Sequence, residues 1–147
     1  MPTSSFEGLD VWRKAHAIVL DVYRVTRKFP REEMFGLTSQ VRRSAASTPS
    51  NIAEGYRRAT KAEKARFYNV ALASLDETRY HLLLAHDLDY ADTSLLRERL
   101  DEVGRMLASY TQAIIASDRS RRTVRMLGIA GLVAGIASSV WLLTSGF

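Results

Sequence analysis

The sequence has no cysteine and only three prolines and eight glycines in 147 residues. Without cysteine, disulfides, thiolate metal sites and thiol nucleophiles are excluded. The scarcity of proline and glycine leaves few breaks in regular structure. Apolar residues recur at intervals of three and four, so the sequence predicts an all-α protein. The N-terminus carries Asp10, Arg13 and Lys14 where a signal peptide would be apolar, so we do not expect secretion.

Acidic residues are unevenly distributed along the chain. Residues 1–66 hold thirteen Lys and Arg against seven Asp and Glu, and residues 67–118 hold four against nine. Residues 119–147 hold four arginines and no acid. The net charge of +5 therefore combines a basic half, an acidic half and a basic collar. This is not the uniformly basic surface of a protein coated by nucleic acid.

Four amphipathic helices are predicted, over about residues 9–28, 35–58, 61–90 and from 94 onward. Phe29-Pro30 ends the first helix, Thr60 and Glu63 form a capping box before the third, and residues 92–94 cap the fourth. Pro49 is expected to kink the second helix without breaking it. The inward positions are Leu9, Trp12, Val19, Val22 and Thr26; Leu37, Val41, Ala45, Thr48 and Ile52; Phe67, Val70, Ala71, Leu75, Leu82 and Ala85; and Leu96, Leu100, Val103, Leu107, Tyr110 and Ile114.

Short connections between four such helices predict an antiparallel up-down-up-down four-helix bundle over residues 1–118. Residues 119–147 form a second unit, a basic collar followed by a hydrophobic helix. We find no internal repeat and no low-complexity linker.

No charged residue occurs in the 22 positions of segment 126–147. A transmembrane helix needs about 20 apolar residues, so this segment is long enough to cross a bilayer. The arginines that precede it predict that the bundle lies on the cytoplasmic side of the membrane. The collar arginines are Arg119, Arg121, Arg122 and Arg125. The alternative is a cytoplasmic protein whose tail is a hydrophobic helix buried in an oligomer.

Segment 42–66 contains seven basic residues but only two acidic ones, Glu54 and Glu63. Such an excess can release counterions from a polyanion, so these residues are candidates for binding nucleic acid or a protein partner. They are Arg42, Arg43, Arg57, Arg58, Lys61, Lys64 and Arg66. Two other interpretations are a solvated helix face and pairing with the acidic half of a neighbouring protomer.

A compact group, Pro49, Asn51, Glu54 and Gly55, is interpreted as structural. Asn51 and Glu54 are expected to pair with backbone groups near the kink or with an arginine such as Arg42. Gly55 is expected at a close packing contact.

The sequence favours a non-enzymatic protein without a metal or cofactor. His81 and His86 are five positions apart and diverge on a helix, and His16 stands alone. No phosphate-binding glycine loop, nucleophile elbow or pair of carboxylates is present.

Residues 6 to about 110 resemble a bacterial four-helix-bundle family first noted in intervening sequences of large-subunit ribosomal RNA genes. Its relatives include the accessory protein of diversity-generating retroelements. The matching residues are Phe6, Leu9, Val11, Trp12, Ala15, Thr26, Phe29, Pro30, Glu33, Gly36, Leu37, Gln40, Val41, Arg42, Arg43, Ala45, Ser47, Pro49, Ser50, Asn51, Ile52, Ala53, Glu54, Gly55, Arg58, Phe67, Ala71, Ser74, Leu75, Glu77, Leu84 and Ala85.

The resemblance implies a homopentameric ring without known catalysis. The resemblance also implies a basic surface. In the retroelement relative, this surface binds nucleic acid and reverse transcriptase. Ala73 and Asp89 depart from the pattern, since the family favours glycine at both positions, and segment 126–147 departs most. Two hypotheses follow. The first is an oligomeric scaffold tethered to the membrane, whose basic surface contacts nucleic acid, a protein partner or anionic lipid. The second is a soluble accessory protein that binds nucleic acid.

Overall fold

The computed structural model describes residues 5–144, and the side chains of residues 5–120 and of Thr123. It contains four α-helices and three short 3₁₀ helices, and no strand in that part of the chain. The α-helices are α1 (Asp10–Val25), α2 (Leu37–Arg57), α3 (Lys61–Asp87) and α4 (Ser94–Thr144). The 3₁₀ helices are η1 (Phe6–Gly8), η2 (Thr26–Lys28) and η3 (Arg31–Glu33). The predicted all-α fold is confirmed.

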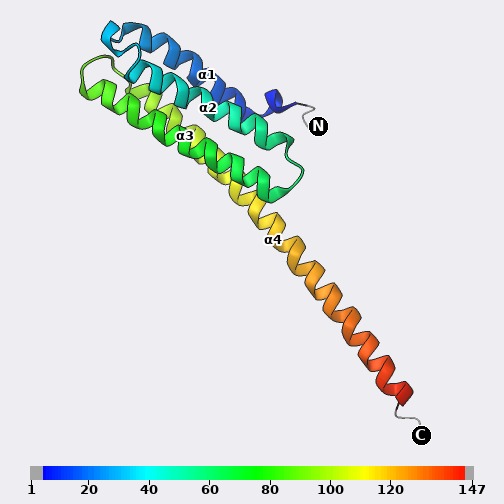
Figure 1. Cartoon of the computed structure of the whole chain (residues 1–147). Helices are drawn as coiled ribbons and strands as arrows, with labels where there is room; N and C mark the ends of the chain where they lie inside the picture. Colours follow the sequence, from blue (N-terminus) through cyan, green and yellow to red (C-terminus); the bar gives the residue numbers. More distant parts are fainter. Residues whose placement is uncertain (1–4, 145–147) are drawn as a thin grey trace.

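The four helices form an antiparallel bundle in which each helix packs against two others (Figure 1). The neighbours are α1 with α2, α2 with α3, α3 with α4, and α4 with α1. Helix α4 has 51 residues and α3 has 27. At 1.5 Å per residue, α4 is about 75 Å long and α3 about 40 Å, so α4 continues past the end of the bundle. The expected division after residue 118 therefore falls inside a continuous helix.

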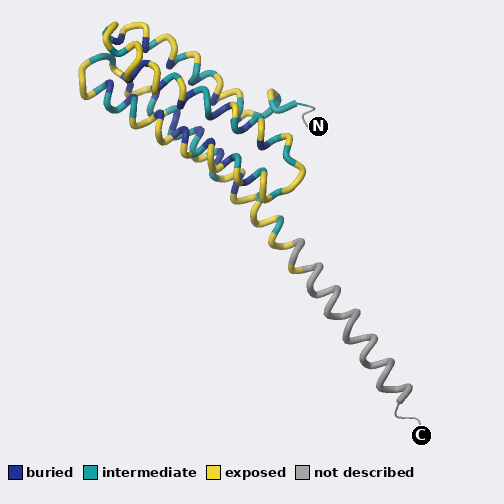
Figure 2. Tube along the Cα trace, viewed as in Figure 1, coloured by how far each residue is buried: buried dark blue, intermediate teal, exposed yellow. Residues whose placement is uncertain are grey.

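The core lies along the inward faces of the helices (Figure 2). All five inward positions predicted for α2 are buried, as are four of those predicted for α3 and four of those predicted for α4. Of the four exceptions, Phe67 and Ile114 are partly buried, whereas Val70 and Tyr110 are 45% and 43% exposed, so the predicted inward position of these two is wrong. Both stand beside a better-placed residue, Ala71 and Thr111, which the helix turns toward the core instead.

The stripe predicted for α1 is displaced from the observed one. The residues that α1 buries fully are Val11, Ala15, Ile18 and Val22, whereas Leu9, Trp12 and Val19 only flank the core. Trp12 turns toward α2, where its indole Nε1 donates a hydrogen bond of 3.1 Å to the carbonyl of Pro49. A tryptophan at the edge of a core can bury its ring and still satisfy its N–H group in this way.

Small residues let α2 and α3 approach closely. Between them runs a row of hydroxyl contacts: Thr78 with Ser44 at 2.9 Å and Ser74 with Ser47 at 2.9 Å. Pro49 interrupts none of this, since α2 continues through it. Short polar side chains that bond to each other leave no room for large apolar ones, so the α2–α3 contact is narrow and specific.

Candidate binding surface at the α2–α3 end of the bundle

A short turn between α2 and α3 brings five cationic residues together. Helix α2 ends where the backbone of Arg58 becomes extended, and the Thr60 hydroxyl caps α3 by accepting from the Glu63 N–H at 3.2 Å. The first half of the predicted capping box, the bond from the Glu63 N–H to the Thr60 hydroxyl, is therefore present. In addition, the Thr60 hydroxyl lies 2.7 Å from Glu63 Oε2. The cations that this turn gathers are Arg57, Arg58, Lys61, Lys64 and Arg66.

Two guanidinium groups lie against one aromatic ring in this turn. The Arg58 guanidinium is 4.6 Å from the centre of the Phe67 ring and forms an ion pair with Glu54. The Arg66 guanidinium is 5.1 Å from the same ring centre. Cation–π contacts of this kind orient the side chains without neutralising their charge.

The two lysines of the turn are held by different partners. Lys64 donates to the Tyr56 carbonyl at 3.0 Å and lies 5.4 Å from the centre of the Tyr56 ring. Lys61 donates to the Ser117 hydroxyl of α4 at 2.6 Å. The Lys61 contact fixes the turn beside α4, two residues before Arg119.

Arg57 and Arg66 are exposed, and neither forms an ion pair with a residue that the structure describes. Within 54–66 and 117–120 there are six Lys and Arg against three acids. We call these two segments the cationic end. In Figure 1 it is the end of the bundle from which α4 continues. Arg119 of the collar is exposed there, while the side chains of Arg121, Arg122 and Arg125 lie outside the described residues.

Arg42 and Arg43 do not join this surface. They precede Arg57 by about four turns of α2, or roughly 22 Å. Arg42 is partly buried, donates from Nε to the Thr26 hydroxyl at 2.9 Å, and stacks 4.8 Å from the centre of the Tyr23 ring. Arg43 donates to Gln40 at 2.6 Å. The structure thus divides the seven predicted cations into two groups.

The acidic half of the chain pairs with basic residues of the same protomer. Asp101 of α4 lies 2.8 Å from Arg79 of α3, and Glu102 forms an ion pair with Lys14 of α1. The Lys14 ammonium holds the pKa of the Glu102 carboxyl below its ordinary value. Because Asp101 and Glu102 pair elsewhere in the bundle, they do not offset the excess of positive charge at the cationic end.

The structural group in α2 has the following geometry. The Asn51 amide donates to the Ser47 carbonyl at 2.8 Å and to the Ser47 hydroxyl at 3.0 Å. Glu54 pairs with an arginine, but with Arg58, four residues on, and not with Arg42 or Arg43. Gly55 is buried, and a Cβ atom built on it would lie 2.7 Å from the Tyr68 ring. These contacts hold the end of α2 against α3.

Glu33 is a structural residue to which sequence reasoning gave no role. One carboxylate oxygen accepts from the Leu37 N–H at the start of α2 at 2.8 Å, and the other from the Tyr90 hydroxyl at 3.0 Å. The hydrogen bond from the Tyr90 hydroxyl to the Glu33 carboxylate favours the protonated hydroxyl, so it raises the pKa of Tyr90. The available signal was the position of Glu33 four residues before Leu37, where a side chain can reach a free helical N–H.

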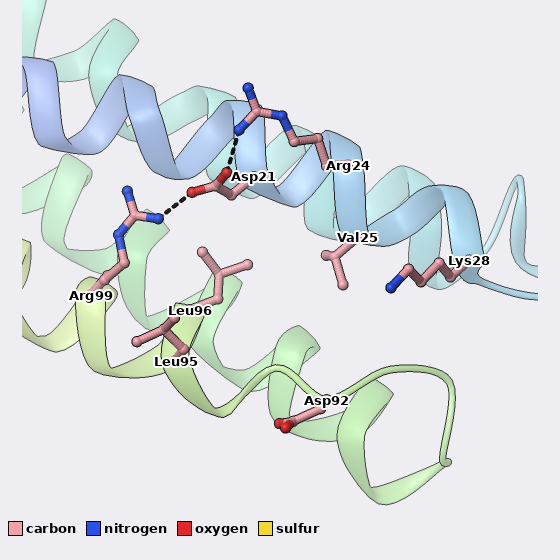
Figure 3. A pocket seen from close by; sticks show the side chains of 8 residues that line it. All are labelled: Asp21, Arg24, Val25, Lys28, Asp92, Leu95, Leu96 and Arg99. Atoms are coloured by element: carbon pink, nitrogen blue, oxygen red, sulfur yellow. Dashed lines mark hydrogen bonds and ion pairs between the residues drawn. The ribbon is translucent and has the colours of Figure 1, made fainter.

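A groove of about 400 Å³ lies between α1 and α4 (Figure 3). Asp21 of α1 stands between Arg24, at 2.6 Å, and Arg99 of α4, and pairs with both. Lys28 and Asp92 lie further along the groove (Figure 3). Because charged side chains pair across α1 and α4, we interpret the groove as a packing contact between these two helices. No cluster of potential metal ligands occurs among the described residues.

The fold and the cationic end define a small helical-bundle protein with positive charge gathered at one end. The model of the family described as "23S rRNA-intervening sequence protein" matches residues 7–109. The chain therefore belongs to the 23S rRNA-intervening sequence protein family.

A solved structure supports the same fold. A protein with unknown function from the S23 ribosomal protein family of Bacteroides thetaiotaomicron superposes with a TM-score of 0.64 and 23% sequence identity. The match covers 69% of this chain and 95% of that chain. No curated protein matches the chain significantly. Neither description names a catalytic activity.

The membrane prediction concerns residues whose side chains lie outside the described part. Within the described part, no helix has a stretch that is both long and apolar enough to span a bilayer. The predicted membrane role of segment 126–147 therefore stays a prediction.

Proposed function

We propose that the protein is a non-enzymatic helical scaffold, tethered by segment 126–147 to the cytoplasmic face of a membrane, which presents its cationic end as a contact surface. The observation that carries the proposal is the continuity of α4. One helix leads from the packed bundle past Ser117 and Arg119 into the segment without charge. The family resemblance adds assembly as a homopentamer to the proposal.

Cell fractionation tests the tether. The intact chain should sediment with membranes, and a chain truncated after Ser117 should stay in the soluble fraction. A matched control keeps the length of the tail and introduces Ala134→Arg and Ala137→Arg. Each arginine near the middle of a span costs about 3 kcal/mol on insertion scales, so this variant should also leave the membrane. Equal distribution of all three proteins would contradict the tether.

The second candidate function is soluble binding to nucleic acid. It is favoured by the exposed, unpaired charge of Arg57 and Arg66. It predicts binding to RNA or DNA that weakens steeply with added salt. Neutralising Arg57, Lys61 and Arg66 should weaken this binding, whereas neutralising Arg42 would also remove its contacts with Thr26 and Tyr23. Binding that is absent or insensitive to salt would exclude this function.

A further inference from the structure

The cationic end lies next to the start of the uncharged segment. The Lys61–Ser117 hydrogen bond of 2.6 Å places the α2–α3 turn beside residue 117 of α4. Residue 126 follows nine positions later in the same helix, which is roughly 13 Å along its axis. The headgroup layer extends about 5–8 Å beyond the hydrocarbon core, so a surface at this distance lies just above the headgroups, within about one Debye length of their charges.

The opposite end of the bundle lacks such an excess of positive charge. Its connections, residues 29–36 and 88–93, contain one cation, Arg31, and four acids, and the adjoining helix η2 adds Arg27 and Lys28. The cationic end has twice as many cations as acids. The bundle is thus polarised along its axis, with its positive pole toward the tail.

The aromatic residues of the cationic end strengthen its fit to a headgroup layer. Tyr56 and Phe67 are partly exposed and lie under Lys64 and under Arg58 and Arg66. Aromatic rings beside cations are the composition that favours the boundary between water and lipid.

From this arrangement we infer that the cationic end binds the headgroups of anionic phospholipids, with Arg57, Lys64, Arg66 and Arg119 as the contacting residues. The inference rests on the proposed tether. The charge is gathered at one tip of the bundle, and the arginines that would extend it along α2, Arg42 and Arg43, stand roughly 22 Å from Arg57. A flat anionic layer fits a tip, whereas a nucleic-acid strand tracks an extended groove. Lipid contact would hold the bundle upright on the membrane.

A single-cysteine experiment tests the inference on the full chain, since the natural sequence has no cysteine. Ala59→Cys places an environment-sensitive fluorophore in the exposed α2–α3 turn, and Glu32→Cys places the control at the opposite end. Each protein is reconstituted into vesicles of phosphatidylcholine, alone or with about one third phosphatidylglycerol, a fraction that gives the surface a negative potential. A trace of lipid with a spin-labelled headgroup acts as quencher.

The label at position 59 should be quenched several-fold more in the anionic vesicles than in the neutral ones, and the label at position 32 should not respond. High salt should reduce the difference. Each neutralised cation, beginning with Arg57→Gln and Arg66→Gln, should lower the apparent affinity for anionic lipid about fivefold.

Flotation of the vesicles at alkaline pH separates this inference from the tether. If the protein floats with both vesicle types and position 59 is quenched equally in both, the tail alone sets its position and the inference is wrong, while the tether stands. If the protein does not float, the tether and the inference both fail. If added single-stranded RNA changes the label in neutral vesicles while anionic lipid does not, the surface binds nucleic acid and the inference is overturned.

Discussion

At the scale of single residues, the packing at the end of α2 depends on Gly55 having no side chain. Gly55 lets the Tyr68 ring, which is 5% exposed, close over the backbone of α2. Burial raises the pKa of the Tyr68 hydroxyl, and the neighbouring Tyr110 and Tyr56 add to that rise. Tyr68 and Phe67 are consecutive, so the packing of one residue against Gly55 also sets the position of the ring that carries Arg58 and Arg66.

Gly55→Ala should therefore destabilise the bundle. The added Cβ would lie 2.7 Å and 2.8 Å from two carbons of the Tyr68 ring and 3.1 Å from Phe67 Cβ. Overpacking of this kind costs about 1–3 kcal/mol, more than the gain of up to about 1 kcal/mol that alanine brings to a helix. The matched control is Gly104→Ala in α4, where a Cβ would have no neighbour within 4 Å and stability should rise. Urea unfolding measures both, and a stabilised Gly55→Ala variant would contradict the close contact.

His81 makes the stability of the bundle depend on pH. Its Nδ1 is buried without a hydrogen-bond partner in the described structure, and burial lowers the pKa of its imidazole; Glu77 opposes this shift and Arg43 adds to it. The unfolded chain, in which a histidine titrates near about pH 6.5, takes up the proton more readily than the folded one. The stabilisation is therefore complete above that pH and is lost as pH falls toward the lower folded pKa.

The prediction for His81 is checked by urea midpoints at about pH 7.5 and about pH 5.5, on either side of the unfolded pKa. The midpoint should fall on acidification, and His81→Gln should make this fall smaller. The unsubstituted chain, measured at the same two pH values, is the control. The Ser94 N–H lowers the pKa of the Asp92 carboxyl and the Lys14 ammonium lowers that of Glu102, so both carboxyls stay charged across this range. An unchanged pH dependence in His81→Gln would refute the assignment.

At the scale of elements, the helices and their ends follow from the sequence because the signals are local. The 3.6-residue period and the Thr60–Glu63 cap define α2, α3 and the start of α4 within a few residues. The stripe of α1 was displaced because apolar residues cover more than one of its faces, and the choice among them depends on α2, which Trp12 contacts. Tyr110 shows the same limit, because the packing of α4 buries the neighbouring Thr111 instead.

The candidate surface was only partly predictable for a similar reason. The sequence identified the excess of positive charge between residues 42 and 66 but not its division, because helical rise separates Arg42 from Arg57. The proximity of Lys61 to Ser117 joins residues 56 positions apart and has no local signal. The position of the cationic end relative to the tail therefore required the structure.

The end of α3 carries an element-scale prediction. Asp89 has φ = 57° and is the one described residue other than glycine with positive φ. The Asp89 N–H bonds to the His86 carbonyl at 3.0 Å and the Tyr90 N–H to the Ala85 carbonyl at 2.9 Å, which is the Schellman termination. This left-handed position explains why the family resemblance implies glycine there.

Asp89→Gly should stabilise the bundle by roughly 0.5–1 kcal/mol, because glycine adopts the left-handed conformation without steric cost. Asp89→Ala is the informative control. It also removes the carboxylate but keeps a Cβ, so it should not stabilise. Thermal unfolding of the three proteins distinguishes the two effects. Equal gains in both variants would show that removal of charge, and not backbone conformation, is responsible.

At the scale of the whole molecule, packing and charge are arranged along one axis. The described core ends in α4 near Thr111 and Ile114. Beyond Ser117, the described side chains of α4 are mostly exposed, and the sequence contains no further acid after Asp118. The packed core of the bundle therefore stops at the cationic end. The proposed tether and the proposed lipid contact both depend on this coincidence.

The same arrangement predicts that the bundle folds without the last 29 residues. A chain truncated after Asp118 keeps every described core residue, so its free energy of unfolding should differ from that of the intact chain by less than about 0.5 kcal/mol, since a helix gains most of its stability from packing. Truncation after Met106 provides the contrast. It removes Leu107, which is fully buried, and Thr111, which is 4% exposed, and should cost several kcal/mol. Urea unfolding followed by circular dichroism, with all chains in the same mild detergent, measures the three proteins. A large loss of stability in the longer truncated chain would show that segment 119–147 packs against the bundle, and it would favour the buried tail over the membrane tether.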